Sequence, residues 1–77
     1  MNISITYFGK LTDITGKSEE HLSIDAPTVS EVKNVLEQSY PVLKQMTFQI
    51  AENNTILKEE DAITIGKIDI FPPFSGG

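Results

Sequence analysis

One stretch of this 77-residue sequence, Thr28 to Ser39, has the apolar periodicity of an α-helix. Its apolar residues fall at positions i, i+3, i+6 and i+7, along one side of a helix: Val29, Val32, Val35 and Leu36. Thr28 and Glu31 have the spacing of a capping box, and Pro41 disfavours helical geometry just before it, so the helix ends near Ser39. One helix with one apolar face has to bury that face against a sheet.

Five further segments are predicted to be strands. In most of them apolar and polar residues alternate, and a turn signal separates one short segment from the strand before it. Asn53 and Asn54 supply one such turn, since asparagine tolerates left-handed geometry. One helix and five strands predict an α+β domain with the helix packed across a single mixed sheet. The predicted strands are 2–8, 19–24, 47–51, 55–57 and 67–71.

The segments between these elements are predicted to be irregular. Residues 9–18 form a loop in this prediction, with Leu11 and Ile14 packed against the core. Residues 41–45 form a connection, and residues 63–65 form at most a brief extended piece.

The composition excludes several classes of function. Eleven acidic against six basic residues give a net charge of −5, which repels polyanions, so we expect no nucleic acid as a partner. The chain has no cysteine, so it has no thiolate nucleophile, thiolate metal site or disulfide. We find no signal peptide and no apolar run of about 18 residues, and we therefore expect a cytoplasmic protein that does not contact a membrane.

Within the body of the chain we find no catalytic constellation. His21 is the single histidine and has no partner with which to build a metal site. The acidic run Lys58 to Asp61 lacks the spaced ligands and the glycine of a calcium loop, so we interpret it as a surface turn. We expect no bound metal or cofactor, and the C-terminal carboxylate is the one group with plausible chemistry.

The C-terminal segment predicts an extended tail. We divide the chain into a domain, residues 1–71, and a tail, residues 72–77. Two successive prolines stiffen the root of the tail, and two glycines at its tip can enter a channel too narrow for other residues. A frayed terminus would explain the glycines but not the prolines. The tail therefore predicts a carboxylate delivered into the active site of a partner. Its residues are Pro72, Pro73, Phe74, Ser75, Gly76 and Gly77.

The order of elements resembles the ubiquitin-like β-grasp fold, whose first and last strands are parallel neighbours. In that arrangement Phe8 and Phe71, each on an otherwise polar strand face, stand together at the root of the tail. With Phe74 they would form an exposed apolar patch of the kind that marks partner surfaces. The alternative is that some of these rings cover the edge of the sheet itself.

The Phe-Pro-Pro-x-x-Gly-Gly ending, the strand end Tyr7 to Leu11 and the overall length resemble the small subunit of molybdopterin synthase, in the ThiS–MoaD superfamily of sulfur carriers. The resemblance implies that an E1-like adenylating enzyme consumes ATP to activate the carboxylate of Gly77, and that a sulfur donor system converts it to a thiocarboxylate. The tail then inserts into the large, catalytic subunit, where the sulfur attacks cyclic pyranopterin monophosphate. The carrier is non-catalytic alone and binds no cofactor.

By the same resemblance, Gly77 carries the sulfur and Gly76 lies in the channel. The residues implied to bind the partner are Phe8, Phe71, Pro72, Pro73, Phe74 and Ser75. Two departures from the family pattern, Glu52 before the turn and residues 61–67 in place of a Gly-Asp turn, affect a surface turn more than the chemistry.

Three alternatives remain open at this stage. The chain could be a sulfur carrier for another pathway, such as thiamin thiazole synthesis, although the diproline and its flanking phenylalanines argue against it. It could be a ubiquitin-like modifier joined through Gly77 to lysines of other proteins. It could also be a binding module whose two terminal glycines have no function.

Overall fold

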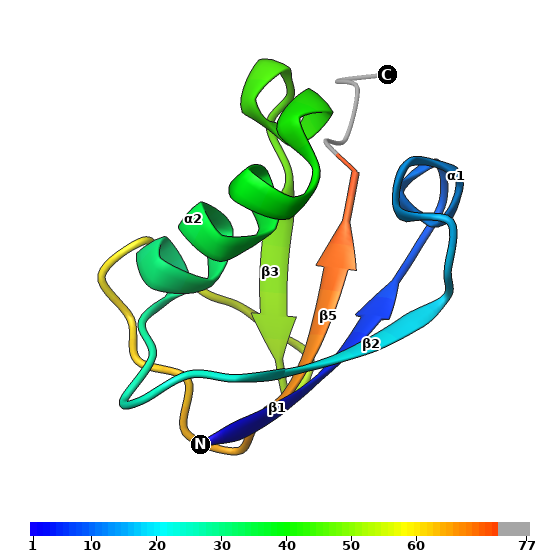
Figure 1. Ribbon diagram of the computed structural model, residues 1–77. Coiled ribbons are helices and arrows are strands. Elements are labelled where there is room, and N and C mark those ends of the chain that lie inside the picture. Colours follow the sequence, from blue (N-terminus) through cyan, green and yellow to red (C-terminus); the bar gives the residue numbers. More distant parts are fainter. Residues whose placement is uncertain (73–77) are drawn as a thin grey trace.

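The protein folds as a five-stranded mixed sheet with one main helix across one face, a ubiquitin-like β-grasp fold, as predicted (Figure 1). The computed structural model describes residues 1–72. The strand order is β2-β1-β5-β3-β4, with β1 and β5 parallel and the other neighbours antiparallel. The strands are β1 (Asn2–Tyr7), β2 (Glu19–Ser23), β3 (Gln49–Glu52), β4 (Thr55–Ile56) and β5 (Lys67–Phe71).

Helix α2 (Val29–Ser39) lies across one face of the sheet, and the core forms between them (Figure 1). The hydroxyl of Thr28 accepts a hydrogen bond from the backbone N–H of Glu31 at 3.3 Å, which confirms the predicted N-cap. The sheet side of the core consists of the alternating apolar residues of three strands, all at most 3% exposed. They are Ile3, Ile5, Tyr7, Ile50, Ile68 and Ile70.

The prediction of a loop over residues 9–18 is wrong in part, because helix α1 (Leu11–Thr15) lies within it. Leu11 is fully buried, and Gly16 ends the helix in the left-handed conformation at φ +76°. A helix of five residues is too short to show an apolar periodicity, so the flanking glycines suggested only a loop. The connection 41–45 is likewise a short 3-10 helix, η1 (Pro41–Gln45).

The late part of the chain differs from the prediction at Glu52. Residues 63–65 form no strand; Ile63 is buried and Ile65 is 59% exposed. Glu52 is 6% exposed and lies on the core face of β3. Its carboxylate accepts hydrogen bonds from the backbone N–H groups of Thr64, Ile65 and Gly66 at 3.1, 2.7 and 3.0 Å. The interpretation of Glu52 as part of a surface turn is therefore wrong, since it holds the connection to β5.

Candidate functional site

The parallel pairing of β1 and β5 brings both strand ends to one edge of the sheet, beside α1 (Figure 1). Tyr7 pairs with Ile70, and the backbone N–H of Phe8 donates a hydrogen bond to the carbonyl oxygen of Ile70 at 3.0 Å. Phe8 and Phe71 therefore lie side by side where the two strands end. Their rings are stacked, with centroids 4.9 Å apart and an interplanar angle of 12°. We call these two residues the aromatic pair.

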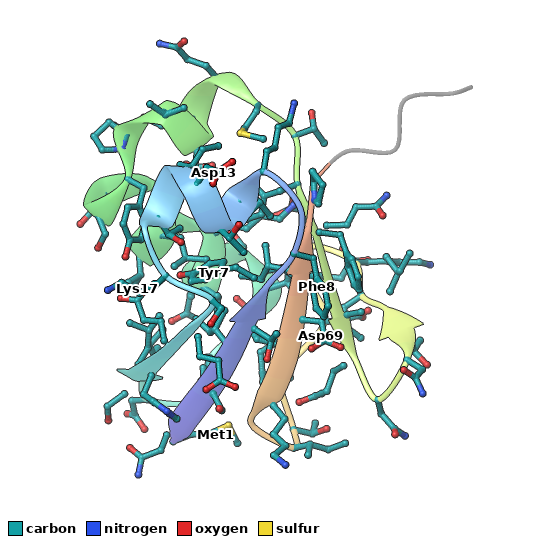
Figure 2. All side chains as sticks on the ribbon, turned by 90° about the vertical axis from the view of Figure 1, so that its right-hand side faces the viewer. Met1, Tyr7, Phe8, Asp13, Lys17 and Asp69 are labelled. Carbon is teal, nitrogen blue, oxygen red and sulfur yellow. The ribbon has the colours of Figure 1, made fainter. Side chains whose placement is uncertain are left out.

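The aromatic pair lies on the face of the sheet that α2 does not cover, the face turned to the viewer in Figure 2. Phe8 is 39% exposed and Phe71 is half-buried. Two stacked rings that both meet water form a compact apolar surface at the ends of β1 and β5, which fits a docking role. One row further along the face lie the acidic side chains of Asp69 and Glu19, both in register with Thr6.

Pro72 follows the aromatic pair directly and packs against Gly9. Gly9 has φ +59°, and a Cβ built on it would lie 3.1 Å from Cγ of Pro72. The carbonyl oxygen of Gly9 accepts hydrogen bonds from the hydroxyl and the backbone N–H of Thr12 at 2.8 and 3.1 Å. The first turn of α1 therefore fixes the backbone against which Pro72 packs.

A polar cluster lies on the core side of the same strand end. The carboxylate oxygen Oε1 of Glu20 accepts hydrogen bonds from the hydroxyls of Tyr7 at 2.6 Å and Tyr40 at 2.9 Å, and Lys17 lies 3.6 Å from Oε2. Burial raises the pKa of Glu20, but these two hydroxyls and the Lys17 ammonium outweigh it, so the pKa of Glu20 lies below its ordinary value. Burial and then the bond to Glu20 raise the pKa of Tyr7 well above its ordinary value. The cluster ties β1 and β2 to the end of α2.

The other residues considered from the sequence lie away from this edge. His21 is exposed on β2, in register with Ser4. The turn at 58–61 caps α2, because the carbonyl oxygens of Glu59 and Asp61 accept hydrogen bonds from the first two amides of the helix. Among residues 1–72, no group of three or more histidine, cysteine or acidic side chains is placed to hold a metal ion. Nor does that part of the chain contain a helix long and apolar enough to span a membrane.

Of the predicted site residues, the structure brings Phe8, Phe71 and Pro72 together. The others, Pro73, Phe74, Ser75, Gly76 and Gly77, lie outside the described residues, so their roles and the boundary between domain and tail stay predictions. Sequence reasoning missed Gly9, although it noted Gly9 as the start of a loop. A glycine directly after a strand was the available signal, but its contact with Pro72 depends on the pairing of β1 with β5.

The fold and the exposed strand-end face define a β-grasp domain of the ubiquitin-like class. The sequence profile of the ThiS family matches residues 5–77, and the chain therefore belongs to the ThiS family, within the ThiS–MoaD superfamily that the resemblance indicated.

Solved structures confirm the fold. A putative molybdopterin converting factor, subunit 1, from Pyrococcus furiosus is similar with a TM-score of 0.86 at 16% identity, over 96% of this chain and 99% of that one. SAMP1 from Haloferax volcanii gives 0.79 at 20% identity over 100% of both chains. Small archaeal modifier protein 1 from Methanosarcina acetivorans gives 0.75 at 24% identity, over 99% and 96%. The fold is thus that of sulfur carriers and ubiquitin-like modifiers.

Proposed function

We propose that this protein is the sulfur carrier subunit of a molybdopterin synthase. The observation that carries the proposal is the stacked, partly exposed aromatic pair at the point where the chain leaves the sheet toward its Gly-Gly end. Membership of the ThiS family supports a carrier, and the Phe-Pro-Pro-x-x-Gly-Gly ending supports this pathway. The Pyrococcus furiosus protein, named a putative molybdopterin converting factor, has the same fold.

In this proposal the chain supplies a carboxylate and a docking surface, and its partners supply the catalytic groups. The carboxylate of Gly77 attacks the α-phosphorus of ATP in the active site of the adenylating enzyme, and pyrophosphate leaves. Sulfide (HS⁻) supplied by the donor system then attacks the acyl adenylate and displaces AMP, and loss of its proton leaves a thiocarboxylate. In the large subunit that sulfur attacks cyclic pyranopterin monophosphate, and water then hydrolyses the resulting thioester, which returns Gly77 to a carboxylate and leaves the sulfur on the pterin. The aromatic pair and Pro72 contact the partner surfaces, and the carrier itself binds no cofactor.

Two steps of this chemistry place different demands on the chain. Activation needs a free carboxylate that reaches the nucleotide, and transfer needs a tail that fits a narrow channel. Glycine at positions 76 and 77 meets both demands, because no Cβ obstructs the approach of another backbone.

A second candidate function is a ubiquitin-like modifier conjugated through Gly77 to lysines. The observation that favours it is the likeness to two structures named as small archaeal modifier protein 1. In that case an amine, not sulfur, attacks the acyl adenylate, and isopeptide-linked adducts accumulate in cells. The third candidate, a carrier for thiamin thiazole synthesis, shares the thiocarboxylate but uses a different acceptor enzyme.

To test the proposal, the protein is incubated with its adenylating enzyme, ATP and a sulfur source, and its intact mass is then measured. We expect exchange of one oxygen for sulfur, located at Gly77 by fragmentation. Incubation of the thiocarboxylate with the large subunit and cyclic pyranopterin monophosphate then distinguishes this pathway from the thiamin pathway. An unmodified mass, with the enzyme shown to be active on another carrier, would contradict the sulfur carrier function and leave the modifier or a plain binding module as the better interpretation.

A further inference from the structure

The contact between Gly9 and Pro72 is too tight for a side chain at position 9 unless the proline ring shifts. A Cβ there would lie 3.1 Å from Cγ and 3.5 Å from Cδ of the proline ring. Carbon atoms that are not bonded prefer separations of about 3.5–4.0 Å. The backbone of Gly9 is also left-handed, with φ +59°, a conformation that residues with a Cβ adopt only with strain. Two independent features of the structure therefore favour glycine at this position.

The backbone of Gly9 cannot move aside easily, because α1 supports it. Its carbonyl oxygen accepts two hydrogen bonds from Thr12, and Leu11, the first residue of α1, is fully buried. On the other side, the ring of Pro72 fixes its own φ angle. The packing of this ring therefore sets the direction in which the chain leaves β5.

We propose that Gly9 is a positioning residue, which together with Thr12 forms a seat for Pro72 and so directs the tail toward the active sites of its partners. This inference rests on the proposed function in one respect, since the effect on turnover assumes that Gly77 is adenylated. We expect the aromatic pair to remain in place when the seat is altered, because the pairing of Tyr7 with Ile70 and the hydrogen bond from the N–H of Phe8 to Ile70 hold it. We therefore expect loss of the seat to lower the rate at which the bound carrier reacts and to leave its affinity for the partner nearly unchanged.

Gly16 supplies a matched control for Gly9. It also has a left-handed backbone, at φ +76°, but a Cβ built on it meets nothing within 4 Å. Gly9→Ala and Gly16→Ala therefore introduce comparable backbone strain, and only the first disturbs Pro72. Gly9→Asn adds a further test, because asparagine tolerates the left-handed conformation better than alanine yet places its Cβ at the same point.

Steady-state kinetics of adenylation measure the effect of each variant on turnover. The rate is monitored as the exchange of labelled pyrophosphate into ATP. For Gly9→Ala and Gly9→Asn we expect kcat to fall roughly tenfold or more with KM for the carrier within about twofold, because misplacement of reacting groups acts on turnover. Gly16→Ala keeps both constants. In the Gly9→Ala/Pro72→Ala double variant we expect the kcat of Pro72→Ala alone, because the two changes remove the same contact. Equal kcat for Gly9→Ala and Gly16→Ala, or losses that multiply in the double variant, would overturn the proposal.

NMR spectroscopy tests the seat without any enzyme. We expect nuclear Overhauser effects between Hα of Gly9 and the ring protons of Pro72 in the wild type and in Gly16→Ala, and their displacement in Gly9→Ala. The effects between Phe8 and Phe71 persist in all three proteins and show that the fold is retained. Absence of the contact in the wild type overturns the seat even if Gly77 is adenylated. If the contact is present but the wild type is not adenylated, the seat is supported and the proposed function fails.

Discussion

The rings of Phe8 and Phe71 lie 4.9 Å apart and nearly parallel, at an angle of 12°, although the residues stand near opposite ends of the sequence. The parallel pairing of β1 with β5 produces this contact, because Tyr7 pairs with Ile70 and the next residue of each strand points to the other face of the sheet. The pairing of the two central strands therefore places the two rings side by side.

Replacement of Phe71 by aspartate should weaken docking to the large subunit and to the adenylating enzyme. Loss of an aromatic anchor commonly costs at least about 2 kcal/mol of binding free energy, which corresponds to roughly a 30-fold increase in Kd. Isothermal titration calorimetry with each partner measures this change.

Ile65→Asp is the matched control for this variant. Ile65 is also an exposed apolar residue, 59% accessible, but it lies just before the opposite end of β5. We expect its Kd to stay within about twofold of the wild type, since surface changes away from an anchor usually alter energies by less than about 0.5 kcal/mol. Equal affinities for the two variants would show that the aromatic pair is not the docking surface.

The overall fold was predictable from the sequence because its signals are local. The capping residues, the apolar stripe of α2 and the alternation in β1 and β5 each lie within a few residues of the chain. The exposure of Phe8 was predictable for the same reason, since this aromatic residue breaks the alternation of Ile3, Ile5 and Tyr7.

The details that were missed depend on contacts between distant segments. The hydrogen-bond donors to Glu52 come from residues 64–66, which are not its neighbours in the sequence. The local sequence shows only an acidic residue before a turn, which suggested an exposed position. The tight contact at position 9 comes from Pro72, at the other end of the chain. Helix α1 was missed because five residues give no periodicity. Local patterns therefore predicted the elements, and the sheet pairing decided how their ends meet.

Glu52→Gln should destabilise the protein at neutral pH. Burial raises the pKa of Glu52, but the backbone N–H groups of Thr64, Ile65 and Gly66 outweigh this effect and hold it below its ordinary value. A glutamine amide presents its own N–H donors to these amides, and buried groups left unsatisfied cost about 1–3 kcal/mol. We expect a loss of about 2 kcal/mol in the free energy of unfolding at pH 7, measured by urea denaturation.

The contribution of Glu52 to the free energy of unfolding should also depend on pH, and the direction of its pKa shift fixes the direction of this dependence. Because its pKa is lower in the folded state, its contribution is fully present above the unfolded pKa of about 4.3 and is lost as the pH falls through the folded-state pKa. The difference between the wild type and Glu52→Gln should therefore shrink in acid. Glu60→Gln, at an exposed position of the 58–61 turn, is the control and should show no such difference. Equal urea midpoints for the two variants at pH 7 would contradict the role of Glu52.

Tyr7 should resist ionisation in alkaline solution. Burial, followed by its hydrogen bond to Glu20, raises the pKa of its hydroxyl well above the ordinary value of about 10. In the unfolded chain the same hydroxyl ionises near pH 10, so stability should decline as the pH rises above that value. A ¹³C NMR titration of the tyrosine Cζ atoms should show no ionisation of Tyr7 at pH 11. Titration of Tyr7 near pH 10 in the folded protein would show that the hydroxyl does not stay bonded to Glu20.

Addition of one alanine after Gly77 should abolish sulfur transfer and leave the fold unchanged. The extension moves the carboxylate by about 3.5 Å and places a Cβ at the tip of the tail. The core of α2 and the sheet lies within residues 1–72, so we expect the urea midpoint of the wild type. The affinity for the large subunit should change less than in Phe71→Asp, because the aromatic pair is untouched. Intact mass after incubation with the adenylating enzyme, ATP and a sulfur source gives the readout, and a thiocarboxylate on the extended chain would refute the proposed role of Gly77.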